Sequence, residues 1–198
     1  MNAFVDAAAT HRPLAEGAGA NRLCDGVICF GGEDWWYHNR GHFDMQMMRE
    51  LSRIAPVLYV NSIGMRVPKV GEGRMFLRRV VRKLKSFRRG FVKVRPGFAV
   101  LSPISVPGRL GSAVSRRLLV GQVRRAAKRM GIRKPLVWVA CPPGVNALDG
   151  LHPAAVVYQR TDRFEAFAGV DRSLISGYDR ALKARADLTI YCSRSLHT

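Results

Sequence analysis

The chain has 198 residues, of which 47% are hydrophobic, so it is long and apolar enough for one sizeable core or for one domain with appendages. Lysine and arginine total 33 against 14 acidic residues, and the formal charge of +19 attracts nucleic acid, anionic membranes or anionic small molecules alike. No apolar run approaches the length of a membrane span, and the four cysteines lack metal-ligand spacing. Composition therefore gives no support to a transmembrane protein or to a cysteine-bound metal site.

The first 22 residues are rich in Ala and Gly and lack the apolar centre of a signal peptide. We expect residues 1–22 to be a disordered leader and residues 23–198 to form the folded domain. Cys29 and Cys192 lie in or at the ends of apolar strands, which predicts buried thiols in a reducing compartment. Both observations favour a cytoplasmic protein.

The first predicted strand, residues 27–30, leads into a loop that is dense in polar and aromatic side chains. This first loop, residues 31–42, begins with two glycines, and a helix follows it. The apolar positions of that helix fall at helical spacing: Phe43, Met47, Met48, Leu51 and Ile54. In an open α/β sheet, a loop between a strand and a helix lies at the crevice where ligands bind, and the helix start offers N–H groups to an anion. The alternative is that the aromatic residues close the end of the sheet and Asp34 caps a turn.

A second strand, residues 56–60, ends at Asn61, and residues 61–68 are expected to form a second loop on the ligand side of the sheet. A strand, a helix and a strand joined by short links predict a parallel pair with a right-handed crossover.

Residues 74–95 change character, because basic residues alternate with apolar ones at three- and four-residue spacing and no acidic residue interrupts them. The pattern predicts a basic amphipathic helix. It suits an anionic bilayer, with these cations near the head groups: Arg78, Arg79, Arg82, Lys83, Lys85, Arg88 and Arg89. A surface helix with a solvated face is the simpler alternative, and nucleic acid is the third.

The rest of the chain continues the alternation of strands and helices. Further strands are predicted at residues 98–101, 136–140, 155–158 and 188–192, and helices at residues 110–130 and 173–186. Gly131 is expected to end the first of these helices, and residues 141–144 to stop the backbone sharply. The fold class is therefore α/β, a Rossmann-like doubly wound parallel sheet with helices on both faces. Neither a P-loop nor a GxGxxG fingerprint is present, so ATP hydrolysis and NAD chemistry have no positive support.

Several of these segments resemble the start of a bacterial GT-B glycosyltransferase, in the group that includes teichuronic-acid-type and related cell-surface polysaccharide enzymes. The first loop is the most specific part, with Phe-Gly-Gly-Glu-Asp-Trp-Trp at residues 30–36. The other similar segments are Arg-Glu-Leu at 49–51, Val-Leu-Tyr-Val-Asn at 57–61, a Tyr-x-x-x-Asp segment at 158–162, and the strand with a Ser-x-x-Leu turn at 186–196. The resemblance spans roughly residues 24–198.

The resemblance implies two Rossmann-like domains facing a cleft, the first holding mainly the acceptor and the second the nucleotide sugar. This chain matches only the first domain, so we expect the donor-binding domain to be absent. Enzymatic activity is then expected only where a separate polypeptide supplies that domain. The implied reaction is metal-independent transfer of a sugar from a nucleotide-diphosphate sugar to a polysaccharide or lipid-linked acceptor, with no cofactor beyond that co-substrate. The basic helix then implies a peripheral position at the inner face of the cell membrane.

Such a transfer needs a base for the acceptor proton and positive or N–H groups for the leaving diphosphate. Asp162, after a late strand, is the first candidate base, with a turn cap as its alternative role, and the second candidates are Asp34, His38 and His42. The predicted substrate- and diphosphate-binding residues are Gly31, Gly32, Trp35, Trp36, Tyr37, Arg40, Asn61, Arg160 and Ser193. Among them, the glycines would let the backbone approach the diphosphate, the arginines would meet negative charge, and the aromatic rings would stack on a sugar.

Two other functions remain open. One is a non-catalytic basic α/β module that binds RNA or another polyanion, and the other is a different small-molecule transferase on the same scaffold. A nucleic-acid module would interleave aromatic residues with its basic stripe, whereas here the Trp and Tyr cluster stands apart from the basic helix.

Overall fold

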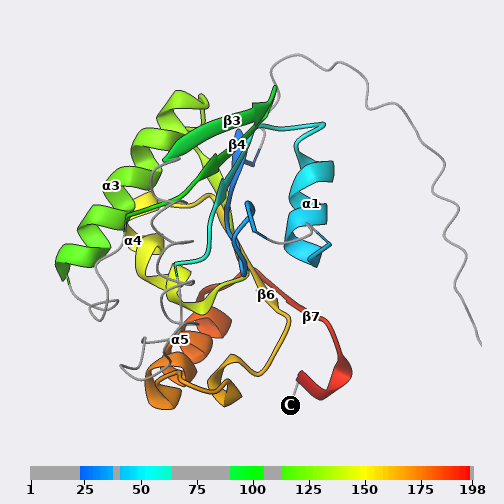
Figure 1. The fold of residues 1–198 in the computed structure, drawn as a ribbon, viewed down its shortest axis with the longest axis vertical. Coiled ribbons are helices and arrows are strands. Elements are labelled where there is room, and N and C mark those ends of the chain that lie inside the picture. The colour runs from blue at the N-terminus through cyan, green and yellow to red at the C-terminus, as the bar shows by residue number, and fades with distance from the viewer. Residues whose placement is uncertain (1–22, 38–40, 64–89, 105–112, 197–198) are drawn as a thin grey trace, which may run out of the picture.

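The computed structural model describes residues 23–37, 41–63, 90–104 and 113–196. One sheet contains all of its strands, in the order β3-β4-β2-β1-β5-β6-β7 (Figure 1). The strands are β1 Gly26–Phe30, β2 Val57–Val60, β3 Phe91–Arg95, β4 Phe98–Leu101, β5 Pro135–Val139, β6 Ala155–Arg160 and β7 Leu188–Tyr191. The α-helices are α1 Phe43–Leu51, α3 Ala113–Arg129, α4 Leu148–Leu151 and α5 Arg172–Arg185, and the 3-10 turns are η1 Pro142–Ala147, η2 Phe164–Ala166 and η3 Arg194–Leu196.

The strand order confirms the doubly wound arrangement. Strand β1 pairs in parallel with both β2 and β5. From β1 the chain proceeds outward through β2 to the edge strand β3 and turns back into β4; it then returns to β5 and proceeds the other way through β6 to β7. This is the order of a Rossmann-like sheet, and the direction of winding reverses between β1 and β5.

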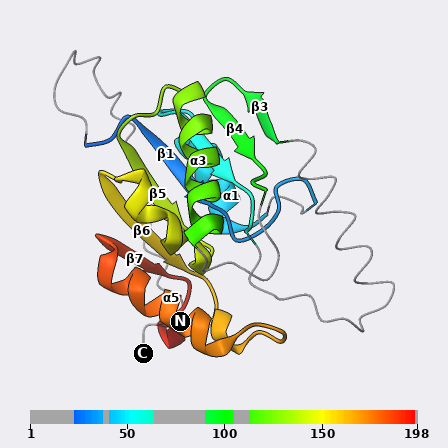
Figure 2. The ribbon, with the colours of Figure 1, turned by 90° about the vertical axis from the view of Figure 1, so that its left-hand side faces the viewer.

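Helices cover both faces of the sheet, with α1 on one side and α3, α4 and α5 on the other (Figures 1 and 2). Alternate side chains of β1 supply the two halves of the core. Val27 and Cys29 belong to the cluster that includes the α1 methionines, whereas Ile28 and Phe30 belong to the cluster under α3, α4 and α5. Because both faces are covered, β1 and β2 are buried along their whole length, which explains their nearly continuous apolar sequences.

The prediction of a helix over residues 74–95 is wrong for its last five residues. Residues 91–95 form β3, an antiparallel edge strand paired with β4, so the sheet is mixed rather than wholly parallel. Gly90 and Gly97 have positive φ angles of 54° and 72°, and Gly97 joins the two strands in a tight turn. The pairing with β4 outweighs the helical spacing that the apolar residues of this stretch share with those before it. Residues 74–89, with all seven predicted membrane-binding cations, lie outside the described residues.

Other boundaries also differ from the prediction. Helix α1 ends at Leu51, and Ile54 is 70% exposed rather than a buried helical position. Residues 141–144 were expected to stop the backbone sharply, but from Pro142 the chain forms η1 and continues into α4. Strand β6 extends two residues further than predicted, so Arg160 belongs to the sheet rather than to a loop.

The helix ends follow the expected chemistry. Gly131 has a φ of 76° after α3, and the Ile132 N–H donates to the Ala127 carbonyl, which confirms the predicted glycine cap. The Asp171 carboxylate accepts from the Leu174 N–H at the start of α5.

Cys29 is buried as predicted, but Cys192, at the end of edge strand β7, is exposed. No helix in the described ranges is long and apolar enough to cross a bilayer.

Candidate functional site

The first loop is attached to the carboxyl ends of β2 and β4 by a buried polar network. Asn61, directly after β2, is 0% exposed, and its Oδ1 accepts from the Trp35 N–H at 2.9 Å. Its amide nitrogen donates to Ser102 Oγ at 2.9 Å and to Asp34 Oδ1 at 3.4 Å. The Trp36 indole N–H also donates to Ser102 Oγ, at 3.3 Å. Asn61 therefore holds the loop in place and has no exposed surface with which to contact a substrate.

A second buried group connects the same loop to α1. Asp44, in the first turn of α1, is 3% exposed, and its Oδ2 accepts from the Gly32 N–H at 3.0 Å and from the Tyr59 hydroxyl at 2.9 Å. Burial and the Asp44 carboxylate raise the pKa of Tyr59 well above its usual value, so the hydroxyl stays protonated and remains a donor. The Gly31 N–H donates to the Val60 carbonyl.

These contacts change the role predicted for Gly31 and Gly32. Both N–H groups already donate within the protein, so neither is directed at a diphosphate. A Cβ at Gly31 would lie 2.0 Å from the Tyr59 hydroxyl oxygen, so this glycine makes room for the tyrosine ring. At Gly32 the nearest atom to such a Cβ is the Ala140 carbonyl oxygen at 3.6 Å. Of the two glycines, Gly32 is therefore the one with room for a side-chain methyl group.

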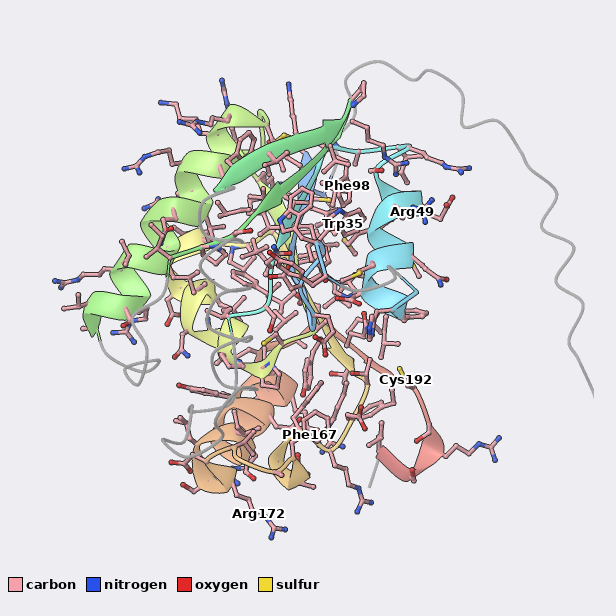
Figure 3. All side chains as sticks on the ribbon, viewed as in Figure 1. Trp35, Arg49, Phe98, Phe167, Arg172 and Cys192 are labelled. Atoms are coloured by element: carbon pink, nitrogen blue, oxygen red, sulfur yellow. The ribbon has the colours of Figure 1, made fainter. Side chains whose placement is uncertain are left out.

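The three aromatic residues of the first loop have different environments. Trp35 is 3% exposed and packs against Tyr59 and Phe98, with ring centroids 5.4 and 4.8 Å away, so it is a core residue rather than a platform for a sugar (Figure 3). Trp36 and Tyr37 are half-buried. The Tyr37 hydroxyl is buried and accepts or donates no hydrogen bond among the described residues.

Asp34 is half-buried at the turn of the first loop. Its Oδ1 accepts from the Trp36 N–H at 3.0 Å, and the Tyr37 N–H donates to the Asp34 carbonyl at 3.2 Å. The alternative role as a turn cap is therefore real for one carboxylate oxygen. The network fixes the orientation of this carboxylate while part of the residue stays in contact with solvent.

The reversal between β1 and β5 lies next to this loop. Ser62 follows Asn61, its N–H donates to the Glu33 carbonyl at 3.4 Å, and its Oγ lies 3.9 Å from the sulfur of Cys141, which follows β5. Cys141 is fully buried. Burial, the Asp44 carboxylate and Cys141 together raise the pKa of Cys29 well above its usual value, so this thiol is a packed core group rather than a nucleophile.

A separate polar cluster joins the carboxyl end of β6 to the middle of α5 and to η3. Arg160 is at the centre of this cluster. Arg160 is 5% exposed, and its Nε donates to Asp179 Oδ1 at 2.9 Å, its Nη1 to the Leu196 carbonyl at 2.7 Å and its Nη2 to Glu165 Oε1 at 3.2 Å. The Tyr158 hydroxyl donates to the same Asp179 oxygen at 2.6 Å. Arg160 is thus a buried structural cation, and the prediction that it meets a substrate phosphate is not compatible with these contacts.

Asp162 and Ser193 lie at the carboxyl ends of β6 and β7 and are exposed. Ser193 Oγ lies 2.9 Å from Ser195 Oγ. Partial desolvation of the thiol and the nearby Asp162 carboxylate raise the pKa of Cys192, although most of this residue is exposed. Strand β5 lies between β1 and β6, which corresponds to about 10 Å at ordinary strand spacing. Asp162 and the first loop therefore share one edge of the sheet, but no bond of the described residues joins them.

His42 is exposed at the residue before α1, and its side chain makes no cap bond to the helix. His38 and Arg40 lie outside the described residues. Within the described ranges, no group of three or more His, Cys, Asp or Glu residues is placed to hold a metal ion.

The sequence analysis missed four residues that build this edge: Asp44, Tyr59, Ser102 and Asp179. Two of them had a weak signal in the sequence, since Asp44 is the only acid in the first turn of α1 and Tyr59 is the only hydroxyl in a run of aliphatic residues. Comparison with known proteins adds no further assignment, because no protein-family profile and no curated protein matches this chain significantly.

Proposed function

We propose that this chain is the acceptor-side domain of a glycosyltransferase that transfers a sugar from a nucleotide-diphosphate sugar to a polysaccharide or lipid-linked acceptor. The observation behind the proposal is the first loop, which presents a half-buried carboxylate and two half-buried aromatic residues beside the reversal between β1 and β5. Ligands of open α/β sheets bind at such reversals. The choice of sugar transfer as the reaction rests on the similarity of residues 30–36 to GT-B enzymes.

Asp34 is the better candidate for the base that accepts the proton of the acceptor hydroxyl. Hydrogen bonds from the Trp36 N–H and the Asn61 amide fix its orientation, and a positioned carboxylate within reach of a hydroxyl is what general-base catalysis requires. Asp162, the alternative base, is exposed at the end of β6, and Arg160 near it is occupied by Asp179 and Glu165.

Trp36 and Tyr37 are the residues we assign to the sugar of the acceptor. Both are half-buried, so each leaves part of its side chain open to a sugar ring. Because the Gly31 and Gly32 N–H groups are occupied, we assign stabilisation of the leaving diphosphate to a separate donor-binding domain.

The experiment is a thermal-shift titration of the chain with saccharide acceptors and nucleotide-diphosphate sugars. A ligand at about 100 times its Kd stabilises the native state by about 2.7 kcal/mol, which raises Tm by about 5–10 °C for a chain of this size. We expect Asp34→Asn and Trp36→Ala to remove the shift caused by the acceptor. Asp162→Asn is the matched control and should keep it.

Two results would refute the proposal. One is that no saccharide or nucleotide sugar changes Tm, and the other is that the shift survives both first-loop variants and is lost in Asp162→Asn.

A second candidate, a module that binds RNA or another polyanion, is favoured by one specific observation. Helix α3 contains six basic residues and no acidic one, and none of the six forms an ion pair with another described residue: Arg116, Arg117, Arg124, Arg125, Lys128 and Arg129. Binding to RNA of any sequence that weakens steeply with salt, without any response to saccharides, would support this candidate instead.

A further inference from the structure

Helix α3 presents a continuous exposed face with a distinct chemical pattern. Its buried side consists of Leu119, Val123, Ala126 and Ala127, which pack on the sheet. On the opposite side, residues follow one another at three- and four-residue spacing and are all exposed. We call this set the outer α3 face: Val114, Arg117, Leu118, Gly121, Arg124, Arg125 and Lys128.

The large aliphatic residues of the outer α3 face lie in its first turns. Val114 is 70% exposed and Leu118 40% exposed, both in the first two turns. Ile104, 56% exposed, lies beside the helix one turn after Leu118, because its backbone N–H and carbonyl bond to the Gln122 side chain at 2.8 and 2.9 Å. Val114 and Leu118 therefore share the first turns of the face with Arg117, Ile104 lies beside its middle, and the later turns are basic apart from Gly121.

The electrostatic state of this face favours an anionic partner. Among the described residues, none of its four cations forms an ion pair, and the nearest atoms to a Cβ at Gly121, in the middle of the face, are more than 4 Å away. Nitrogen-tipped side chains project from the outer side of α3, away from the sheet (Figure 3). In contrast, Arg129 at the edge of the face lies 5.6 Å from the ring centroid of Phe91 and has a packing role.

The apolar end of the face lies toward the candidate site. Helix α3 connects the carboxyl end of β4 to the start of β5, and these strands are parallel to β1. The helix therefore runs antiparallel to the strands, so its first turns lie at the carboxyl edge of the sheet, where the first loop also lies (Figure 2).

We propose that the outer α3 face binds the surface of an anionic lipid bilayer, with Ile104, Val114 and Leu118 in contact with the acyl boundary and the cations among the phosphates. This inference rests on the proposed function in that it names the surface that would bring the first loop to a lipid-linked acceptor. A helix with aliphatic residues beside cations that pair with no other described residue matches both the acyl layer and the phosphate layer of such an interface. The phosphates of a nucleic acid would not interact favourably with the exposed aliphatic side chains. The face also contains no aromatic residue on which a base could stack.

The test is sedimentation of the full chain with vesicles of phosphatidylcholine and phosphatidylglycerol in equal parts. Each basic residue near an anionic surface contributes about a fivefold gain in affinity, so the triple variant Arg117→Gln, Arg124→Gln, Arg125→Gln should bind about a hundredfold more weakly. The double variant Val114→Gln, Leu118→Gln should bind about tenfold more weakly, and its loss should persist in high salt because it is apolar.

The matched control removes the same charge elsewhere. Arg172, Arg180 and Arg194 are exposed, and none forms an ion pair within the described ranges. Their triple substitution by Gln should weaken binding by less than about threefold, which separates the α3 face from the general effect of the +19 charge. Unchanged melting temperatures verify that all variants fold.

Three outcomes would overturn the inference: no sedimentation of the wild type with these vesicles, equal losses in the two triple variants, or loss of RNA binding but not of vesicle binding in the α3 variant. Vesicle binding without any response to saccharides would leave the α3 inference standing and refute the sugar-transfer proposal. The assay contains no sugar donor or acceptor, so the two failures are distinguishable.

Discussion

Replacing Arg160 by methionine should destabilise the protein strongly, because this guanidinium neutralises two carboxylates inside the fold. Its side chain is 6% exposed and forms ion pairs with Asp179 at 2.9 Å and Glu165 at 3.2 Å. Removing one partner of a buried ion pair typically costs about 3–5 kcal/mol, since the remaining charge is left uncompensated. The Leu196 carbonyl, 2.7 Å from Nη1, also loses its donor. Lys183, 3.2 Å from the other Asp179 oxygen, offsets part of the loss.

Urea denaturation followed by tryptophan fluorescence measures this change, and a loss of about 3–5 kcal/mol corresponds to a decrease in Tm of about 6–20 °C. Arg163→Met is the matched control, because Arg163 is exposed and its Nη2 donates to the carbonyl of Ser195 in η3 at 3.1 Å. The control should cost less than about 0.5 kcal/mol. A loss below about 1 kcal/mol for Arg160→Met, or equal losses for both variants, would refute the structural role of Arg160.

Three further predictions concern the carboxyl edge of the sheet and α5. Gly31→Ala should cost about 2–4 kcal/mol, because its Cβ would lie 2.0 Å from the Tyr59 hydroxyl, whereas Gly32→Ala should change stability by less than about 0.5 kcal/mol. Asn61→Ala should cost about 1–3 kcal/mol by leaving buried partners unsatisfied, and should also remove acceptor binding. Burial raises the pKa of Asp179, but the bonds from Tyr158 and Lys183 and the Arg160 charge outweigh it, so the pKa is lowered. The stability from Asp179 is therefore complete above its unfolded pKa of about 3.9 and is lost as the pH falls through the lower folded value.

Chemical denaturation checks each of these predictions. Equal effects of the two glycine variants would contradict the assignment of Gly31 to the tyrosine contact. A wild-type Tm and unchanged acceptor binding in Asn61→Ala would show that the first loop does not depend on this amide. For the pH effect, Asp179→Asn is the control. If the free energy of unfolding falls as much at acid pH in this variant as in the wild type, Asp179 is not the source of the pH dependence.

The alternation of short apolar strands with helices was enough to predict the doubly wound sheet. Strands β1 and β2 are buried on both faces, so nearly all their residues are apolar, and this pattern is visible without knowledge of their neighbours. The glycine after α3 predicted the helix end correctly for the same reason, because a positive φ is a local requirement. The position of the first loop at the carboxyl edge also followed from chain order alone.

The sequence pattern failed where two segments far apart in the chain compete or cooperate. Residues 91–95 continue a helical spacing, yet they form β3 because β4 supplies hydrogen-bond partners. Arg160 has the sequence context of a loop cation, and only the approach of α5 places Asp179 beside it. Trp35 follows two acids in a polar loop but is buried, since Phe98 of β4 and Tyr59 of β2 pack against its ring.

For the candidate site, the sequence by itself determined which residue types are present at the edge of the sheet, and the tertiary structure decided which of them face solvent. Asn61 and the two glycines were predicted to contact a ligand, but their polar groups bond to the loop, to β2 and to α1. Asp34 and Trp36 remain partly exposed in the same network. The reason is physical: a side chain's type is encoded at its own position, whereas its burial and bonding partners depend on strands and helices that meet only in the folded chain.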